Sequence, residues 1–484
     1  MRNLLSVLVC ITFMMSPSLP AQNQQWPMVN CEKGRSSWAS FETVLYPPLQ
    51  EVNVYPVKTE SANTDALTLY NGLLCISLEN DPNVLEAFDL QTGDTLWTFM
   101  PPETVAANDH TAAQNDSLVF FGGQWGLGLY ALYRESGEIK WFKPCGSLSC
   151  RNVILDEDLA YFVCDSLYCI DIADGSTIWS FKFNNKATPA VDDHHVYISG
   201  SDRSRAFDKF TGSLIWEQYN GGQSFIPATV DDLHFYTGTN DSVVARSKEN
   251  GGIQWAFQIP EGELADFSQN ALSVSDSFLC FICWENSEGK AMLYALDKFT
   301  GAEHWRHTFE GEGVFPSMIA NGVVYLVTDY DGALNGFNVR TGQQVFYNND
   351  YWFSDQVIVA NHRLYAGADE RVVVFESIGT GISESQMKKP ASIGLLQNYP
   401  NPFNAATEIE FVLQKESRIE MAVFNIQGQA VQSLYRDRQE AGIHRIAWYA
   451  DPYPAGLYLC RLEIFENGEK GARRIITHKM ILQK

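Results

Sequence analysis

A repeated pattern in the middle of this 484-residue chain constrains the fold more than any other feature. In each copy a short apolar run precedes Asp or a substitute, and a Gly then stands four positions before an aromatic residue. Seven copies end at the aromatic residues Trp97, Trp141, Trp179, Trp216, Trp255, Trp305 and Phe346. Successive aromatic residues are 37 to 50 positions apart. This spacing suits the blades of a β-propeller, each with four strands and about 40 residues.

Between these aromatic residues the chain has the pattern of short strands. Runs rich in β-branched and aromatic residues, such as 196–200, 235–238 and 323–327, are separated by turns of Gly, Asn and Asp. Such runs are typical of β-hairpins, and helical spacing of apolar residues is sustained nowhere. One four-stranded sheet cannot bury both of its faces, so we expect an all-β region of sheets stacked around an axis. The Trp residues of the repeat should then pack between neighbouring blades.

The number of blades follows from the two ends of the repeat region. The last unit, residues 357–381, has the early strands of a blade but no following Trp. A strand is predicted around 50–57, where Tyr55 stands 42 residues before Trp97, which is close to one period. We expect this strand to complete the last blade and close the ring, which leaves no open sheet edge. Counting Tyr55 gives an eight-bladed propeller, and a seven-bladed one is the alternative.

The repeats over residues 26–381 resemble the quinoprotein-like, or PQQ-binding-like, β-propeller family. The most typical parts are the opening Trp26-Pro27-Met28 and the unit that runs from Leu293 to Trp305. This family includes quinoprotein alcohol dehydrogenases, which hold PQQ and calcium in the central channel. It also includes non-enzymatic members such as an outer-membrane assembly lipoprotein. The resemblance therefore implies a fold and leaves the function open.

The N-terminus has the features of an export signal. Arg2 precedes an apolar run over 4–15, and Ser and Pro residues break that run before Ala21. This order predicts a signal peptide over 1–21, with cleavage after Ala21. The run is shorter than a helix needs to cross a bilayer, and no other segment is as apolar, so we expect no transmembrane span in the mature chain.

The C-terminus differs from the repeats in pattern. After a propeller at 22–381 and a polar linker at 382–394, residues 395–484 show alternating strands separated by Gly turns. That pattern predicts a small Ig-like β-sandwich. The segment resembles the C-terminal sorting domain of the type IX secretion system of Bacteroidetes-like bacteria. The residues that carry the resemblance are Asn398, Tyr399, Pro400, Asn401, Pro402, Phe403, Gly456, Tyr458 and Lys479.

The sorting resemblance implies a location and one partner. The chain would use the type IX secretion machinery and pass through the periplasm. It would then be released outside the cell or remain attached to the outer-membrane surface.

The net charge of the chain limits the classes of partner that it is expected to bind. The whole chain has 34 Lys+Arg and 58 Asp+Glu, a formal net charge of −24. From residue 392 onward the counts are 11 and 10, so residues 22–391 carry 22 basic and 48 acidic residues, a net of −26. Phosphate backbones and anionic lipid surfaces need a Lys/Arg-rich surface, so neither nucleic acid nor an anionic membrane is an expected partner.

The sequence offers no clear catalytic set. Quinone dehydrogenases of the resembling family often carry two adjacent Cys, and this chain has no Cys-Cys pair and no Cys-x-x-Cys-His haem motif. Residues 329–332 begin like a calcium loop, but position 340 is Arg340 where such a loop needs an acid, so turn chemistry is the favoured explanation. We assign no catalytic, cofactor-binding or metal-binding residue, and we expect no cofactor, with calcium or PQQ as the alternative.

Nine cysteines remain after signal removal, and an exported protein can form disulfides. Cys164 and Cys169 flank a predicted turn, and Cys145 and Cys150 bracket four residues, so both pairs are disulfide candidates. Each would close a short loop and stabilise by roughly 2 kcal/mol at best. Cys280 and Cys283 stand in an apolar strand, where positions i and i+3 face opposite sides, so we expect buried thiols there.

These observations favour a secreted or cell-surface propeller that acts as a binding or scaffolding module. Its partner would be an extracellular protein or glycan, contacted at the channel mouth and at loops such as 122–126. The alternatives are an extracellular quinone- or calcium-dependent oxidoreductase and a glycan-binding surface protein.

Overall fold

The structure is a computed structural model of the chain. It describes residues 28, 37–40, 42, 44–57, 63–79, 85–102, 112–122, 128–145, 150, 152–182, 188–200, 202–220, 228–239, 241–265, 272–285, 289–311, 314, 318–378, 394–399, 403–404, 406–413, 417–439, 442–450, 452–465 and 473–483. The predicted signal peptide and most of the predicted linker lie outside these residues. The described residues form strands and turns and contain no helix, so none of them belongs to a helix that could cross a membrane.

Antiparallel sheets recur along the first four fifths of the chain, as the repeat predicts. The first four are β3–β6 (Asn63–Tyr70, Leu73–Glu79, Leu85–Asp89 and Thr95–Phe99), β7–β10 (Ala113–Gln114, Leu118–Gly122, Leu129–Tyr133 and Ile139–Lys143), β11–β14 (Ile154–Asp156, Leu159–Val163, Ser166–Asp171 and Thr177–Lys182) and β15–β18 (Ala190–Val191, His195–Ser199, Arg203–Asp208 and Leu214–Tyr219).

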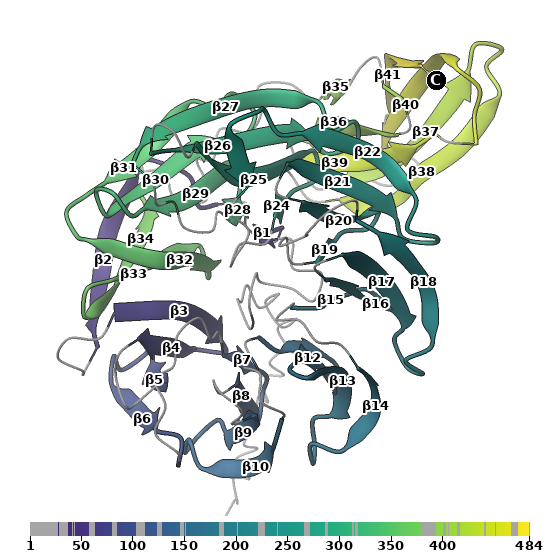
Figure 1. The fold of residues 1–484 in the computed structure, drawn as a ribbon. Coiled ribbons are helices and arrows are strands. Elements are labelled where there is room, and N and C mark those ends of the chain that lie inside the picture. The colour runs from purple at the N-terminus through teal and green to yellow at the C-terminus, as the bar shows by residue number, and fades with distance from the viewer. Residues whose placement is uncertain are drawn as a thin grey trace, which may run out of the picture.

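Four further sheets follow in the same region. They are β19–β22 (Thr229–Val230, His234–Thr239, Ser242–Ser247 and Ile253–Gln258), β23–β27 (Glu263–Ala265, Ser273–Val274, Phe278–Glu285, Lys290–Asp297 and Glu303–Glu310), β28–β31 (Met318–Ala320, Val323–Thr328, Ala333–Asn338 and Gln344–Asn348) and β32–β34 (Phe353–Ala360, Arg363–Ala368 and Arg371–Ser377). The described residues thus hold eight such sheets, arranged around a common centre in Figure 1. The number of blades of the whole chain stays a prediction.

Two N-terminal strands join sheets from the far end of the region. β2 (Leu49–Pro56) pairs antiparallel with β34 as the outer strand of the last sheet, which is the closure that the sequence predicts. β1 (Trp38–Ala39) pairs parallel with β28 at the inner edge of its sheet. The inner strand β3 contacts both β7 and β32, so the first sheet has neighbours from both ends of the repeat region.

The aromatic residues of the repeat lie between neighbouring sheets. Each Gly of the repeat packs directly beneath the aromatic side chain of the preceding sheet. A Cβ added to Gly212 would lie 2.6 Å from Cδ2 of Trp179, and one added to Gly137 would lie 2.6 Å from Cδ2 of Trp97. Both glycines have positive φ, +69° and +71° respectively, a conformation in which a side chain is strained. Space and backbone conformation therefore both require glycine at this contact.

The same aromatic residues donate a hydrogen bond across the contact. The indole Nε1 of Trp179 lies 2.9 Å from the carbonyl oxygen of Lys209 in the next sheet. The other five bonds of this kind run from Trp97 to Arg134, Trp141 to Ile172, Trp216 to Lys248, Trp255 to Lys298 and Trp305 to Val339, at 2.7 to 3.1 Å. The hydroxyl of Tyr55 reaches the carbonyl of Leu90 at 3.3 Å, so β2 brings an equivalent donor to the closing contact.

The C-terminal residues form two further sheets. One contains β35 (Gly394–Tyr399), β36 (Ala406–Leu413) and β39 (Gly442–Tyr449); the other contains β37 (Ser417–Asn425), β38 (Ala430–Gln439), β40 (Gly456–Phe465) and β41 (Arg473–Leu482). Their inner faces share one core, in which Trp448 is fully buried. Figure 1 shows this unit, in yellow, outside the ring of sheets. The arrangement agrees with the predicted β-sandwich.

We predict that Gly212→Ala destabilises the folded chain by roughly 2–4 kcal/mol, because the new methyl group meets Trp179 and the backbone is strained. Gly322→Ala is the matched control, since Gly322 has φ +74° with no atom within 4 Å of the added Cβ. That control should lose only about 1 kcal/mol from backbone strain. Urea denaturation of both variants measures the difference, and equal losses would refute the steric part of the argument.

Candidate functional site

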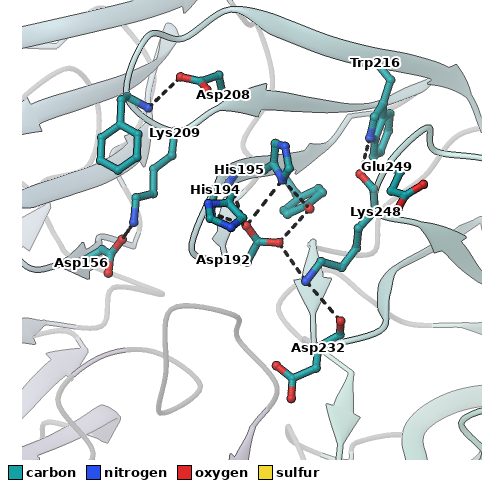
Figure 2. A network of polar contacts seen from close by, with 12 residues as sticks. Asp156, Asp192, His194, His195, Asp208, Lys209, Trp216, Asp232, Lys248 and Glu249 are labelled. Atoms are coloured by element: carbon teal, nitrogen blue, oxygen red, sulfur yellow. Dashed lines mark hydrogen bonds and ion pairs between the residues drawn. The ribbon is translucent and has the colours of Figure 1, made fainter. Parts of the chain in front are cut away.

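Charged residues form regular pairs at the three contacts between four consecutive sheets. An Asp at or after the first strand of one sheet faces a Lys that follows the third strand of the next sheet. Lys209 Nζ lies 2.5 Å from Asp156 Oδ2, Lys248 Nζ lies 2.9 Å from Asp192 Oδ2, and Lys298 Nζ lies 3.0 Å from Asp231 Oδ2. Figure 2 shows the first two pairs. We call these six residues the inter-sheet charge pairs.

Asp192 has the most complete set of partners, and Figure 2 shows it between His195 and Lys248. The backbone N–H groups of His194 and His195 both donate to Oδ1 at 2.8 Å, as expected for an Asp that opens a tight turn. The hydroxyl of Tyr197 donates to Oδ2 at 2.9 Å. Burial alone raises the pKa of Asp192, but Lys248 and the two backbone donors outweigh it and hold the pKa at about 2.

Asp231 repeats this arrangement one sheet further on. The backbone N–H groups of Leu233 and His234 donate to Oδ1 at 2.8 and 2.7 Å, and Tyr236 donates to Oδ2 at 3.0 Å. Burial raises the pKa of Asp231, but the charge of Lys298 more than offsets it, so the pKa lies below its usual value. The same charge pair raises the pKa of Lys298, although burial alone would lower it.

The three lysines of these pairs have a structural role that was not predicted from the sequence. The three lysines directly follow the Asp of the repeat, or its substitute Ser247, in three consecutive repeats, and that recurrence was the available signal. Each lysine makes two links to the preceding sheet. Its ammonium binds an Asp of that sheet, and its backbone carbonyl accepts the indole N–H of a Trp of the same sheet. The charges are satisfied within the protein, so the pairs hold sheets together rather than face a substrate.

A second group of side chains is open to solvent. Where sheet β28–β31 meets sheet β32–β34, Tyr330, Tyr347 and Trp352 are 67%, 49% and 51% exposed. The hydroxyl of Tyr347 donates to Asp331 Oδ2 at 3.2 Å. Trp352 packs over Gly332, where an added Cβ would lie 2.7 Å from Cδ2 of the indole. We call Tyr330, Tyr347, Trp352 and Asp331 the aromatic surface.

The turn beneath this surface is formed by residues 329–332. Asp331 Oδ1 accepts hydrogen bonds from Thr328 Oγ1 at 2.5 Å and from the backbone N–H of Ala333 at 3.2 Å. These bonds are turn chemistry, as the sequence favours. Among the described residues no three His, Cys, Asp or Glu side chains are placed to hold a metal ion. That the chain needs no cofactor stays a prediction.

The structure separates one predicted cysteine pair. β12 and β13 pair with Val163 opposite Leu167 and Tyr161 opposite Cys169, so Cys164 lies in the turn and does not face Cys169. The turn is tighter than the predicted 165–168, because Ser166 already belongs to β13. This register corrects the expected pairing of Cys164 with Cys169.

The other predicted pair is brought together. Cys145 and Cys150 lie next to each other, and Cys164 joins them as a third thiol. Cys280 and Cys283 are both buried in β25, but they belong to two different core clusters on opposite faces of the sheet. Their placement agrees with the prediction of separate buried thiols.

The sorting residues fall partly within the described chain. Phe403 is buried against Trp448, with ring centroids 5.3 Å apart, and its backbone N–H donates to Ile481 at 2.9 Å. Tyr458 is buried, Lys479 is exposed in β41, and Gly456 begins β40. Asn398 and Tyr399 belong to β35. Residues 400–402 lie outside the described residues, as do residues 123–126 of the predicted loop.

Two protein-family models match this chain. The model described as outer membrane protein assembly factor BamB matches residues 164–282 and 285–388. The model described as a secretion system C-terminal sorting domain matches residues 397–478. Each match falls on one of the two structural units, the first on the stacked sheets and the second on the sandwich.

Solved structures share the fold at low sequence identity. BamB from Moraxella catarrhalis is 18% identical with a TM-score of 0.55, over 69% of this chain and 99% of that one. Quinohemoprotein alcohol dehydrogenase from Comamonas testosteroni is 12% identical with a TM-score of 0.60, over 78% of this chain and 83% of that one. At such identities the likeness shows a propeller fold of the PQQ type and nothing about activity.

One curated protein is similar in sequence. Tetrathionate hydrolase from Acidithiobacillus ferrooxidans is 22% identical over 197 residues. The match spans 37% of this chain and 40% of that protein, so this chain covers less than half of its length.

We predict that Lys248→Met destabilises the chain by about 2 kcal/mol at pH 7, because Asp192 is left charged and half-paired. The pKa of Asp192 is depressed to about 2 from 3.8, so its stabilising contribution is present above pH 4 and is lost as the pH falls toward 2. The free-energy difference between the variant and the wild type should therefore shrink over that range. Urea titrations from pH 7 to pH 2.5 measure it. A difference that does not change with pH would contradict the assignment.

Proposed function

We propose that this chain, a PQQ-like repeat β-propeller joined to a type IX secretion sorting domain, is an exported module that binds neutral glycans. The sorting domain directs export through the type IX secretion system to the cell surface or the extracellular space. The propeller is the part of the chain that is exported, and the residues on its surface indicate its function.

The observation that carries the proposal is the aromatic surface. Trp352 is half exposed although it packs over Gly332, and Tyr330, two positions before Gly332, is exposed over two thirds of its area. Large aromatic side chains that stay open to water on a rigid scaffold are typical of binding sites. Their flat apolar faces suit the C–H face of a sugar ring, while the carboxylates of Asp329 and Asp331 can accept hydrogen bonds from sugar hydroxyls.

Charge supports a neutral ligand. The acidic balance of residues 22–391 disfavours a polyanion such as nucleic acid or an acidic polysaccharide. The inter-sheet charge pairs do not change this, because their lysines are already neutralised by Asp156, Asp192 and Asp231.

We predict that Trp352→Ala weakens binding to neutral glycans at least about tenfold, because burial of such a ring is worth roughly 1.5–3 kcal/mol. Gly332→Ala should have a similar effect by displacing the indole. Phe210→Ala is the matched control, since Phe210 is 59% exposed but lies on a different turn. The purified exported chain, titrated against the neutral and anionic members of a glycan array, provides the measurement.

Two results would overturn the proposal. One is an array without binding to any neutral glycan, or with binding that Trp352→Ala and Phe210→Ala weaken equally. The other is reproducible dye-linked dehydrogenase turnover that depends on added pyrroloquinoline quinone and calcium, since that would place catalysis in the propeller.

Removal of residues 395–484 is expected to stop export, because these residues form the sorting domain. The shortened chain should accumulate in the periplasm while the full chain reaches the cell surface or the medium. Cell fractionation followed by immunoblotting with an antibody against the propeller distinguishes these locations. Recovery of the shortened chain outside the cell at the level of the full chain would contradict this role.

A further inference from the structure

Three cysteines lie together at one rim of the ring. Cys145 follows the outer strand β10, Cys150 precedes the inner strand β11 of the next sheet, and Cys164 lies in the turn between β12 and β13. Cys150 and Cys164 are buried in one core cluster, and the half-buried Cys145 packs against that cluster. Cys150 also lies directly against Gly122, where an added Cβ would be 3.2 Å from its Sγ. We call these three residues the thiol cluster.

The three cysteines of the cluster are held in place by different structural elements. The turn that holds Cys164 is tied by a hydrogen bond from its own N–H to the carbonyl of Ser166 at 3.0 Å. The thiol of Cys145 lies 3.9 Å from the carbonyl of Lys143 at the end of β10. Because two neighbouring sheets supply the cluster, its geometry depends on how those sheets pack and not on one hairpin.

The three thiols are not equivalent. Hydrogen bonds from Cys150 and then from Cys164 lower the pKa of Cys145 to about 5, against an opposing effect of burial. Hydrogen bonds to Cys145 and burial both raise the pKa values of Cys150 and Cys164. Cys280, which has no such partners, has its pKa raised by burial alone. The most accessible thiol of the cluster is therefore the one that ionises most readily.

We propose that the thiol cluster is a thiol–disulfide exchange site, in which Cys145 attacks a disulfide and Cys150 resolves the product. The chemical class of the substrate is a disulfide, either in a small thiol compound or on another protein. The inference is independent of glycan binding, because the thiol cluster and the aromatic surface lie on different sheets.

The exchange balances without any further reactant. The Cys145 thiolate attacks one sulfur of the substrate R–S–S–R′, which forms a Cys145–S–S–R bond and releases R′S⁻. Cys150 then loses its proton and attacks the Cys145 sulfur, which forms the Cys145–Cys150 bond and releases RS⁻. Two electrons pass from the two thiols to the substrate disulfide, and the two protons end on the two released thiols. Exchange of this kind proceeds through such a mixed disulfide and is favoured by an attacking thiol of low pKa.

Cys164 acts as a positioning residue in this scheme. It donates a hydrogen bond to the Cys145 thiolate and remains a thiol after the Cys145–Cys150 bond forms. An exported chain meets oxidising conditions, so a substrate disulfide is available where the protein works.

The first experiment measures reactivity. The reduced full chain is alkylated briefly with iodoacetamide between pH 4 and 9, and each cysteine is quantified by peptide mass spectrometry. Cys145 should react at least about tenfold faster than Cys280 at pH 6, with a midpoint below pH 7. Cys164→Ala should move that midpoint upward, and Cys280→Ser should leave it unchanged. A Cys145 midpoint above pH 8 would overturn the proposal.

The second experiment follows the products. Incubation of the reduced chain with oxidised glutathione, and separately with a disulfide-bonded peptide, should remove two thiols and yield a peptide cross-linked through Cys145 and Cys150. Cys150→Ser should instead retain glutathione on Cys145. Reaction with only one of the two reagents identifies the source of the substrate. No loss of thiols with either, the same adduct level in wild type and Cys150→Ser, or stoichiometric zinc that protects the cluster would each overturn the proposal.

Discussion

The contact between an aromatic side chain of one sheet and a glycine of the next is the interaction on which this structure depends. An indole such as Trp179 can approach the backbone at Gly212 only because no Cβ intervenes. At that distance its N–H reaches the carbonyl of Lys209 at 2.9 Å, so apolar packing and a satisfied hydrogen bond come from one side chain. Repeated from sheet to sheet, this contact sets both the spacing and the rotation of neighbouring sheets.

The residue whose carbonyl accepts the indole N–H also decides whether a charged side chain lies at the contact between two sheets. At three consecutive contacts this residue is a lysine, and its ammonium binds an Asp of the preceding sheet. Arg134 uses the same position in another way, donating to the backbone carbonyl of Asn71 at 3.0 Å. Elsewhere the position is apolar, as at Ile172 and Val339. A buried charge is tolerated here only with a partner in reach, which the fixed sheet spacing provides.

The features that could be predicted from the sequence are those that follow from residue types at a fixed spacing along the chain. The Gly and Trp of each repeat, and even the distant Tyr55 that completes the ring, follow from the period and its residue types. Partners across sheets were not predictable in the same way, because Lys209 and Asp156 are 53 positions apart and only the packed ring brings them together. The cysteines show how sensitive such predictions are to register. The turn at Cys164 is shorter than expected, and Cys164 interacts with Cys145 and does not face Cys169.

The order of the strands in an antiparallel sheet places the inter-sheet charge pairs on one rim of the ring. It places the thiol cluster and the aromatic surface on the other rim. In a four-stranded antiparallel sheet, the turns after the first and third strands lie at one end, and the turn after the second strand lies at the other end with the connection to the next sheet. Asp192 and Lys248 belong to the first end, where charges are paired across sheets. Cys164 and Tyr330 follow second strands, and Cys145 and Trp352 belong to connections between sheets, so the thiol cluster and the aromatic surface share the other end. The charge pairs at the first rim link neighbouring sheets and so help to rigidify the ring. The opposite rim carries the exposed aromatic side chains and, of the three thiols, only Cys145 is partly open to solvent there.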